Sequence, residues 1–245
     1  MIVKHTLTGW EIISQYAHGL LAGKIASQLN TSLMQDFWVD ALTAIVEHDD
    51  YLLNFEEHNY LTQNGSPKDF TMDTNSPSDA LEHAKRVFEN SMQKSQLIAL
   101  LIGRHLSFLY ESLAGDYEPL KQFLSEIDSK RSTQRKLYAI SKKTEDELYN
   151  ILLFSDRCSL ILNQDKIPEV GRKVEINKTI NNERYYLRQK EDNSITVEPW
   201  PFKSDFFKVH SEYKVLDTPV YKDNNHLKKV LAEADFKMRT YIFKK

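Results

Sequence analysis

The hydrophobic periodicity of this chain changes near residue 163. This change limits the folds that the chain can adopt more than any other feature of the sequence does. Before this point, apolar residues recur at helical spacing, as Ala17, Leu21 and Ile25 do. After it, large apolar residues alternate with polar ones, as in FFKVHSEYKVL, and four of the seven prolines occur there. The pattern predicts two regions, a helical one over 1–163 and a small α+β appendage over 164–245.

The helical region is expected to form a bundle. Helices are predicted over about 14–29, 36–53, 78–88, 94–113, 119–128 and 132–162, with a long polar loop over 54–77. The segments ERYYLRQ, ITVEPWPF, FFKVHSEYKVL and KMRTYIF predict strands, and residues 1–13 read as extended with a turn at Thr8-Gly9. The predicted fold is therefore mainly α, with a small antiparallel sheet that the C-terminal region forms together with the N-terminal strand.

Charge and composition exclude several classes of partner. The net charge of −3 and the pI of about 6.3 give no basic field for a nucleic acid polymer or an anionic membrane. The longest purely apolar run, Leu97–Ile102, is far shorter than the ~20 residues of a membrane helix. The single cysteine, Cys158, and the lack of a signal-peptide pattern at the N-terminus favour a cytoplasmic protein.

Polar residues face the predicted core from four separate helices. In the stretch AIVEHDDYLL, His48 and Asp49 share a helix face with the apolar Ile45. The same spacing argument places three more residues on inward faces: His18, His105 and Asp156. Burying such groups without partners is costly, so each of them needs a hydrogen bond or an ion.

Two interpretations of these residues compete. A single inward histidine or aspartate is more often a hydrogen-bonded core residue than a metal ligand. Taken together, however, three histidines and two carboxylates would need many separate partners, whereas one shared metal site satisfies them all. Imidazole with carboxylate suits Mn²⁺, Fe²⁺, Zn²⁺, Co²⁺ or Ni²⁺, bound as one or two ions.

The order His18, His48-Asp49, Asp156 resembles the H…HD…D pattern of the HD-domain metal-dependent phosphohydrolases, an all-α superfamily. Several segments, among them SQYAHGLLAGKIA, AIVEHDDYLLNFE and LLFSDRCSLIL, are similar to an uncharacterised bacterial family, domain of unknown function 3891. The superfamily resemblance implies an HD-like bundle in which His18, His48, Asp49 and Asp156 bind metal. It also implies that His105 and His83 bind a second ion.

The resemblance implies a metal-dependent hydrolase of a phosphorylated small molecule or nucleotide, with His48 and Asp49 at the reacting centre and metal-activated water. An HD-like di-iron oxygenase would use nearly the same ligands, and a non-catalytic metal- or nucleotide-binding regulatory module is a third alternative. A ferritin-like di-iron bundle is disfavoured, because no inward histidine follows a glutamate by three residues. The oligomeric state stays open, with a homodimer as one option.

Overall fold

The computed structural model describes residues 1–30, 37–50, 53–72, 76–115, 117–177 and 180–245. Within these ranges it contains seven α-helices and seven strands. The helices are α1 Gln15–Ala26, α2 Trp38–Glu47, α3 Pro77–Lys94, α4 Gln96–Ala114, α5 Glu118–Leu137, α6 Lys142–Asn163 and α7 Asn224–Glu233. The strands are β1 Ile2–His5, β2 Trp10–Ile13, β3 Val174–Asn177, β4 Tyr185–Gln189, β5 Ile195–Glu198, β6 Phe206–Leu216 and β7 Phe236–Lys244.

All seven strands join one curled sheet in the order β1-β2-β6-β7-β5-β4-β3. Neighbouring strands are antiparallel except β5 and β7, which are parallel. With 51% helix and 19% strand, the fold is mixed α/β. The prediction of a mainly α, HD-like bundle with a small antiparallel sheet is therefore wrong. Most of the individual strands are predicted from the sequence. Their assembly into one sheet through β6 is not, because it depends on strand pairs that lie far apart in the sequence.

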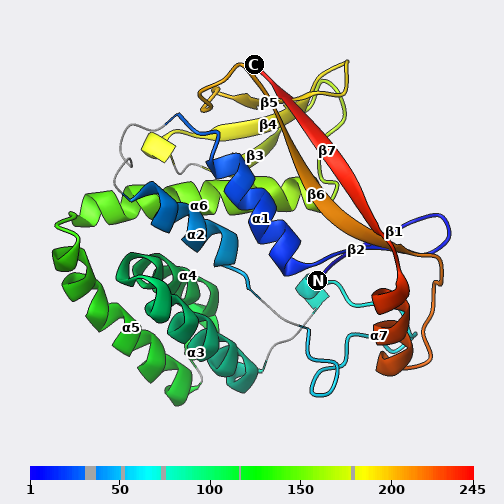
Figure 1. Ribbon diagram of the computed structural model, residues 1–245, viewed down its shortest axis with the longest axis horizontal. Coiled ribbons are helices and arrows are strands. Elements are labelled where there is room, and N and C mark those ends of the chain that lie inside the picture. Colours follow the sequence, from blue (N-terminus) through cyan, green and yellow to red (C-terminus); the bar gives the residue numbers. More distant parts are fainter. Residues whose placement is uncertain (31–36, 51–52, 73–75, 116, 178–179) are drawn as a thin grey trace.

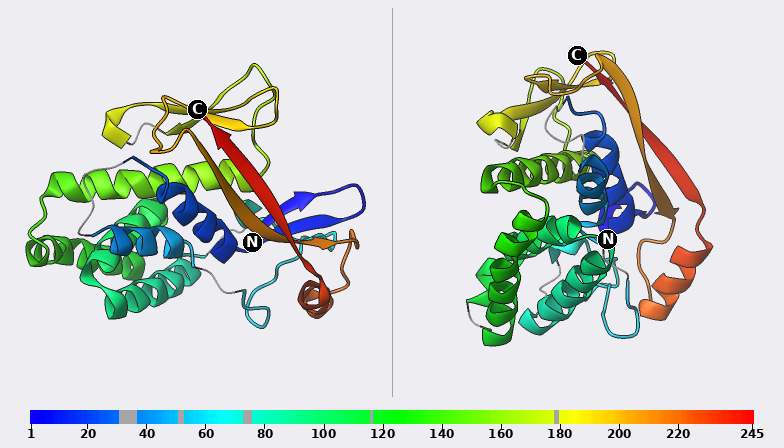
Figure 2. Two further views of the ribbon diagram at one scale, coloured as in Figure 1. Left: turned by 45° about the horizontal axis from the view of Figure 1, so that its top comes forward. Right: turned by 60° about the vertical axis from the view of Figure 1, so that its left-hand side comes forward.

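Two helices lie between the sheet and the rest of the bundle. Figures 1 and 2 show α1 beside β6 and α6 beside β3 to β5, while α3, α4 and α5 lie on the side of α6 that faces away from the sheet. One hydrophobic core continues from the bundle into the sheet, with Phe154 of α6 packed edge-on against Tyr185 of β4. The sheet thus holds α1 and α6 at a fixed separation, and these two helices carry His18 and Asp156.

The end of α2 differs from the prediction of a helix that continues to residue 53. The helix ends at Glu47, so His48 is its C-cap and Asp49 lies in the turn that follows. Three carboxylates, Glu47, Asp49 and Asp50, crowd a helix end that already carries partial negative charge, which disfavours further helix. Residues 36, 51–52 and 73–75 of the predicted helix and loop lie outside the described ranges.

Helix α4 is long and apolar enough to cross a membrane by length and composition alone. The most apolar 18-residue stretch of this helix has a mean hydropathy of 1.3, and 61% of that stretch is buried inside the protein. A core helix satisfies the same criteria. In this fold α4 packs between α3 and α5 and contributes Leu100, Leu101 and Leu106 to the core.

Gly19 permits the close approach of α1 and α2. A Cβ at this position would lie 2.1 Å from the backbone oxygen of Val46, which cannot move without shifting α2. We expect Gly19→Ala to lower the free energy of unfolding by about 1–3 kcal/mol, as overpacking does. Urea denaturation measures this loss. Gly115→Ala is the control, since its Cβ would meet only the Ser112 oxygen at 3.8 Å; equal stabilities of the two variants would contradict the argument.

Candidate metal centre

Five predicted site residues converge where α1, α2, α4 and α6 meet. The ligand atoms of His18, His48 and Asp49 lie within 4.8 Å of one another, and so do those of His48, His105 and Asp156. His48 belongs to both groups, so the two groups form one cluster. The three histidines are 0–1% exposed, which means that their ring nitrogens must be satisfied inside the protein.

The hydrogen bonds around His18 allow two tautomers. The Ser159 hydroxyl lies 2.8 Å from Nδ1 of His18 and 2.9 Å from the backbone oxygen of Asp156. When its proton points to that carbonyl, it accepts from Nδ1, and Nε2 of a neutral ring has a lone pair for a metal ion; when it points to Nδ1, Nε2 donates to Asp156. Nε2 lies 3.1 Å from Asp156 Oδ1 and 3.9 Å from Asp49 Oδ2.

His48 repeats this arrangement from the end of α2. Its Nδ1 lies 2.7 Å from the backbone oxygen of Ile45 and must donate to it, because a carbonyl only accepts. Its Nε2 lies 3.3 Å from Asp156 Oδ1 and 4.0 Å from Asp49 Oδ2. Nε2 of His18 and Nε2 of His48 thus both face the carboxylate of Asp156, an arrangement that a proton or a metal cation between nitrogen and oxygen stabilises.

Without a metal, a proton on His48 stabilises the contact between this imidazole and the carboxylates. Burial alone would lower the pKa of His48, but the carboxylates of Asp156 and Asp49 and the bond to Ile45 raise it to about 9. Burial would raise the pKa of Asp156, yet the His48 and His18 rings hold it well below its usual value. A divalent cation would replace the proton and pair with both carboxylates.

His105 adds a third, neutral imidazole. Burial, together with the charge of His48, lowers its pKa to about 4, so it is unprotonated at neutral pH. Its Nδ1 lies 3.4 Å from the hydroxyl of Tyr149 on α6, and Phe108 stacks on its ring at a centroid distance of 6.2 Å. Nε2 is the ring nitrogen left to bind an ion with His48 and Asp156.

His83 does not belong to either group of ligand atoms. Its Nδ1 lies 2.8 Å from the Tyr110 hydroxyl. Burial lowers the pKa of His83, and a hydrogen bond with the Asp50 backbone partly offsets this effect. The ring thereby links α3 to the turn that carries Asp49. In this arrangement His83 supports the position of a ligand, and its predicted role at a second ion stays a prediction.

The cluster is buried on its histidine side and partly open on its carboxylate side. The side chains of Asp49 and Asp156 are 22% and 17% exposed, whereas those of His18 and His48 are 0% exposed. Water and a small substrate can therefore approach the carboxylate edge, as in catalytic metal sites that keep one position open. Imidazole nitrogens with carboxylate oxygens fit a first-row divalent ion.

Sequence reasoning missed the groups that orient the ligands. Ser159 fixes His18, Tyr149 contacts His105, and Gln15 donates a long bond of 3.5 Å to Asp49 Oδ2. Such supporting partners are typical of metal-binding histidines. Ser159 could have been found, because it follows Asp156 by three residues and so faces the same way along α6.

Comparison with known proteins gives one family. A family model described as "Protein of unknown function (DUF3891)" matches residues 1–218 of the 245. No curated protein and no solved structure matches the chain significantly. The resemblance to HD domains is not supported, since no HD relative is found and the large mixed sheet conflicts with an all-α HD domain.

Proposed function

Because the chain belongs to the DUF3891 family of proteins of unknown function, we propose its activity from the site itself: a metal-dependent hydrolase of a phosphorylated small molecule. The supporting observation is the pair of imidazoles, His18 and His48, whose Nε2 atoms face the carboxylates of Asp49 and Asp156 at a partly open edge. This proposal depends on the geometry of these four residues and needs no relationship to HD domains.

The ligand set would hold one or two ions of Mn, Fe, Zn, Co or Ni. Such an ion lowers the pKa of bound water and so supplies hydroxide for attack on a phosphoester. The protein orients the metal ligands. Ser159 and the Ile45 carbonyl orient the imidazoles of His18 and His48. Asp49 offers a partly exposed oxygen that would help to bind or position an ion. Water displaces the leaving group, which departs with a proton.

A cavity of about 650 Å³ between α4, α5 and α6 supports a phosphorylated substrate. Three cations and two carboxylates line it, so its charge sums to +1: Arg104, Lys121, Arg131, Glu111 and Asp128. Arg104 and Arg131 are paired with Asp146 and Asp128, so a phosphate would compete with these carboxylates. Tyr149 and Phe108 also line the cavity and contact His105, which places one layer of side chains between it and the candidate metal centre. Guanidinium and ammonium groups are the side chains that bind phosphoryl oxygens.

The test combines metal analysis with turnover. Protein purified without chelator or a metal-affinity tag is analysed for metals, and phosphate release from p-nitrophenyl phosphate, sugar phosphates and nucleotides is measured with each ion. We expect near-stoichiometric metal and phosphoester hydrolysis that falls at least about 100-fold in Asp49→Asn. His210→Ala, which changes an exposed histidine on β6, is the control and should retain both.

Three other outcomes would refute the hydrolase. Two irons per chain without phosphoester turnover would favour a di-iron oxygenase, which uses similar ligands. A metal that is bound, lost in Asp49→Asn, and inert toward every phosphoester would favour a regulatory metal-binding module. Wild-type protein that binds none of the ions would leave the cluster as a protonated polar network.

A further inference from the structure

A second cavity lies on the opposite face of α1 from His18. It has a volume of about 390 Å³ and is bounded by α1, by β6 and by the segment that leads from α7 into β7. Its lining is mostly apolar, with Ile12, Ala17, Leu53 and Leu231 among the residues that form it. Both the volume and the composition are those of small-molecule pockets, which measure roughly 300–1,000 Å³.

Two large apolar residues of the lining are exposed. Leu20 and Phe236 are 47% and 70% exposed, so part of the apolar lining is in contact with solvent. An occupant with a hydrocarbon chain would bury these side chains.

A buried hydroxyl in the lining lacks a partner. Ser211 on β6 is 3% exposed, and its Oγ makes no hydrogen bond with any described residue. A buried hydroxyl without a partner costs free energy comparable to a lost hydrogen bond. A polar ligand atom in the cavity would satisfy it.

Two ammonium groups give the lining a net positive charge. Lys24 donates to the backbone oxygen of His210, the residue before Ser211, and Lys214 donates to the backbone oxygen of Leu231. Glu212 is the single acidic residue in the lining, so the charge of these groups sums to +1. Lys24 and Ser211 line the same cavity, and Lys24 is bound to the backbone of the residue before Ser211, so an anionic group in the cavity would bind both.

From the apolar lining, the unpartnered hydroxyl of Ser211 and the Lys24 ammonium in the same lining, we infer that this cavity binds a single-chain amphiphile with a carboxylate head, such as a medium-chain fatty acid. The hydrocarbon chain lies among Ile12, Ala17 and Leu231. One carboxylate oxygen accepts from Ser211 and the carboxylate pairs with Lys24. The site uses none of the five clustered ligands, so it is independent of the proposed hydrolase activity.

The test is calorimetric titration of the full chain with decanoate, decanol and decyltrimethylammonium, each below its micellar concentration. We expect decanoate to bind at least about tenfold more tightly than decanol, and the cationic amphiphile to bind most weakly. Ser211→Ala should weaken decanoate binding about tenfold, since it removes a hydrogen bond to a charged group, and Ala17→Phe, which fills the cavity, should abolish it.

A matched serine separates binding from folding. Ser91 is 2% exposed and its hydroxyl donates to the Phe88 oxygen at 2.6 Å, so Ser91→Ala should lower the melting temperature and leave decanoate binding unchanged. Ser211→Ala loses no protein hydrogen bond and should not lower the melting temperature. The inference is overturned if the wild type does not bind decanoate, if all three amphiphiles bind equally, or if neither cavity variant weakens binding.

Discussion

Asp156→Ala is expected to weaken metal binding more than any other single change in the cluster. Its Oδ1 lies 3.1 Å from Nε2 of His18 and 3.3 Å from Nε2 of His48, so one oxygen faces both imidazoles. Changes to groups that only support ligands typically cost 10–100-fold in metal affinity. Loss of this central carboxylate should therefore cost more than about 100-fold, measured by competition with a chelator of known affinity.

The same substitution should change how metal affinity depends on pH. In the metal-free protein His48 is protonated below its pKa of about 9, and a metal must displace that proton. Affinity in the wild type should thus rise about tenfold per pH unit up to about pH 9. In Asp156→Ala the main group that raises this pKa is gone while burial still lowers it, so the rise should stop at a lower pH than in the wild type.

Asp146→Ala is the matched control for this experiment. Asp146 lies on the same helix, its side chain is 41% exposed, and it pairs with Arg104 rather than with a histidine. Metal affinity and its pH dependence should match the wild type. If Asp156→Ala and Asp146→Ala bind metal equally well, the candidate metal centre is misassigned.

The sequence was most informative about single elements. Helical spacing located α1, α4 and the start of α3 to within a few residues, and alternation located the β6 strand. The end of α3, predicted at residue 88, lies at Lys94. It misplaced the break between the last two helices of the bundle: α5 continues to Leu137 and α6 begins at Lys142. Apart from Ile127, the segment EIDSKRSTQRK is polar, so it has no apolar stripe to mark where one helix ends.

The clustering of the five polar residues could be predicted, because burial of polar groups is costly wherever it occurs. Inward-facing positions alone selected His18, His48, Asp49, His105 and Asp156, and the structure brings these five together. The predicted fold was wrong because the resemblance to HD domains, carried by few residues, gives no information on strand pairing. The short strand β3, with only four residues, was missed, and the pairing of β2 with β6 joins residues about 200 positions apart.

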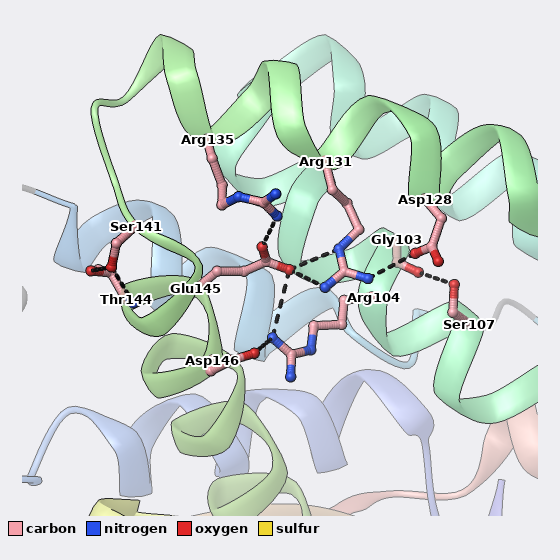
Figure 3. A network of polar contacts seen from close by, with 10 residues as sticks. All are labelled: Gly103, Arg104, Ser107, Asp128, Arg131, Arg135, Ser141, Thr144, Glu145 and Asp146. Carbon is pink, nitrogen blue, oxygen red and sulfur yellow. Dashed lines mark hydrogen bonds and ion pairs between the residues drawn. The ribbon is translucent and has the colours of Figure 1, made fainter.

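A buried ion cluster was also missed, and it gives the largest expected effect on stability. Glu145, in the first turn of α6, is 0% exposed and accepts hydrogen bonds from Arg131 and Arg135, with Arg104 close to the same carboxylate. Figure 3 shows three guanidinium groups from two helices converging on this one side chain. The residues are dispersed over α4, α5 and α6, so no local pattern indicates their contact.

We expect Glu145→Ala to lower the free energy of unfolding by about 3–5 kcal/mol, because it removes the one buried carboxylate that three arginines share. Arg131 and Arg104 would keep only the more exposed Asp128 and Asp146. Here Arg131 and Arg135 would repel each other across the interface of α5 and α6. For a chain of this size, that loss corresponds to a melting temperature about 10 °C lower. Calorimetry and urea denaturation both measure it.

Two further variants separate charge from packing in this cluster. Asp146→Ala removes a partly exposed partner of Arg104 and should cost less than about 1 kcal/mol. Replacing Glu145 by leucine together with Arg131 and Arg135 by methionine removes the buried charges on both sides and should recover much of the lost stability. A loss below about 1 kcal/mol in Glu145→Ala would show that water reaches the guanidinium groups and that the cluster does not hold α5 against α6.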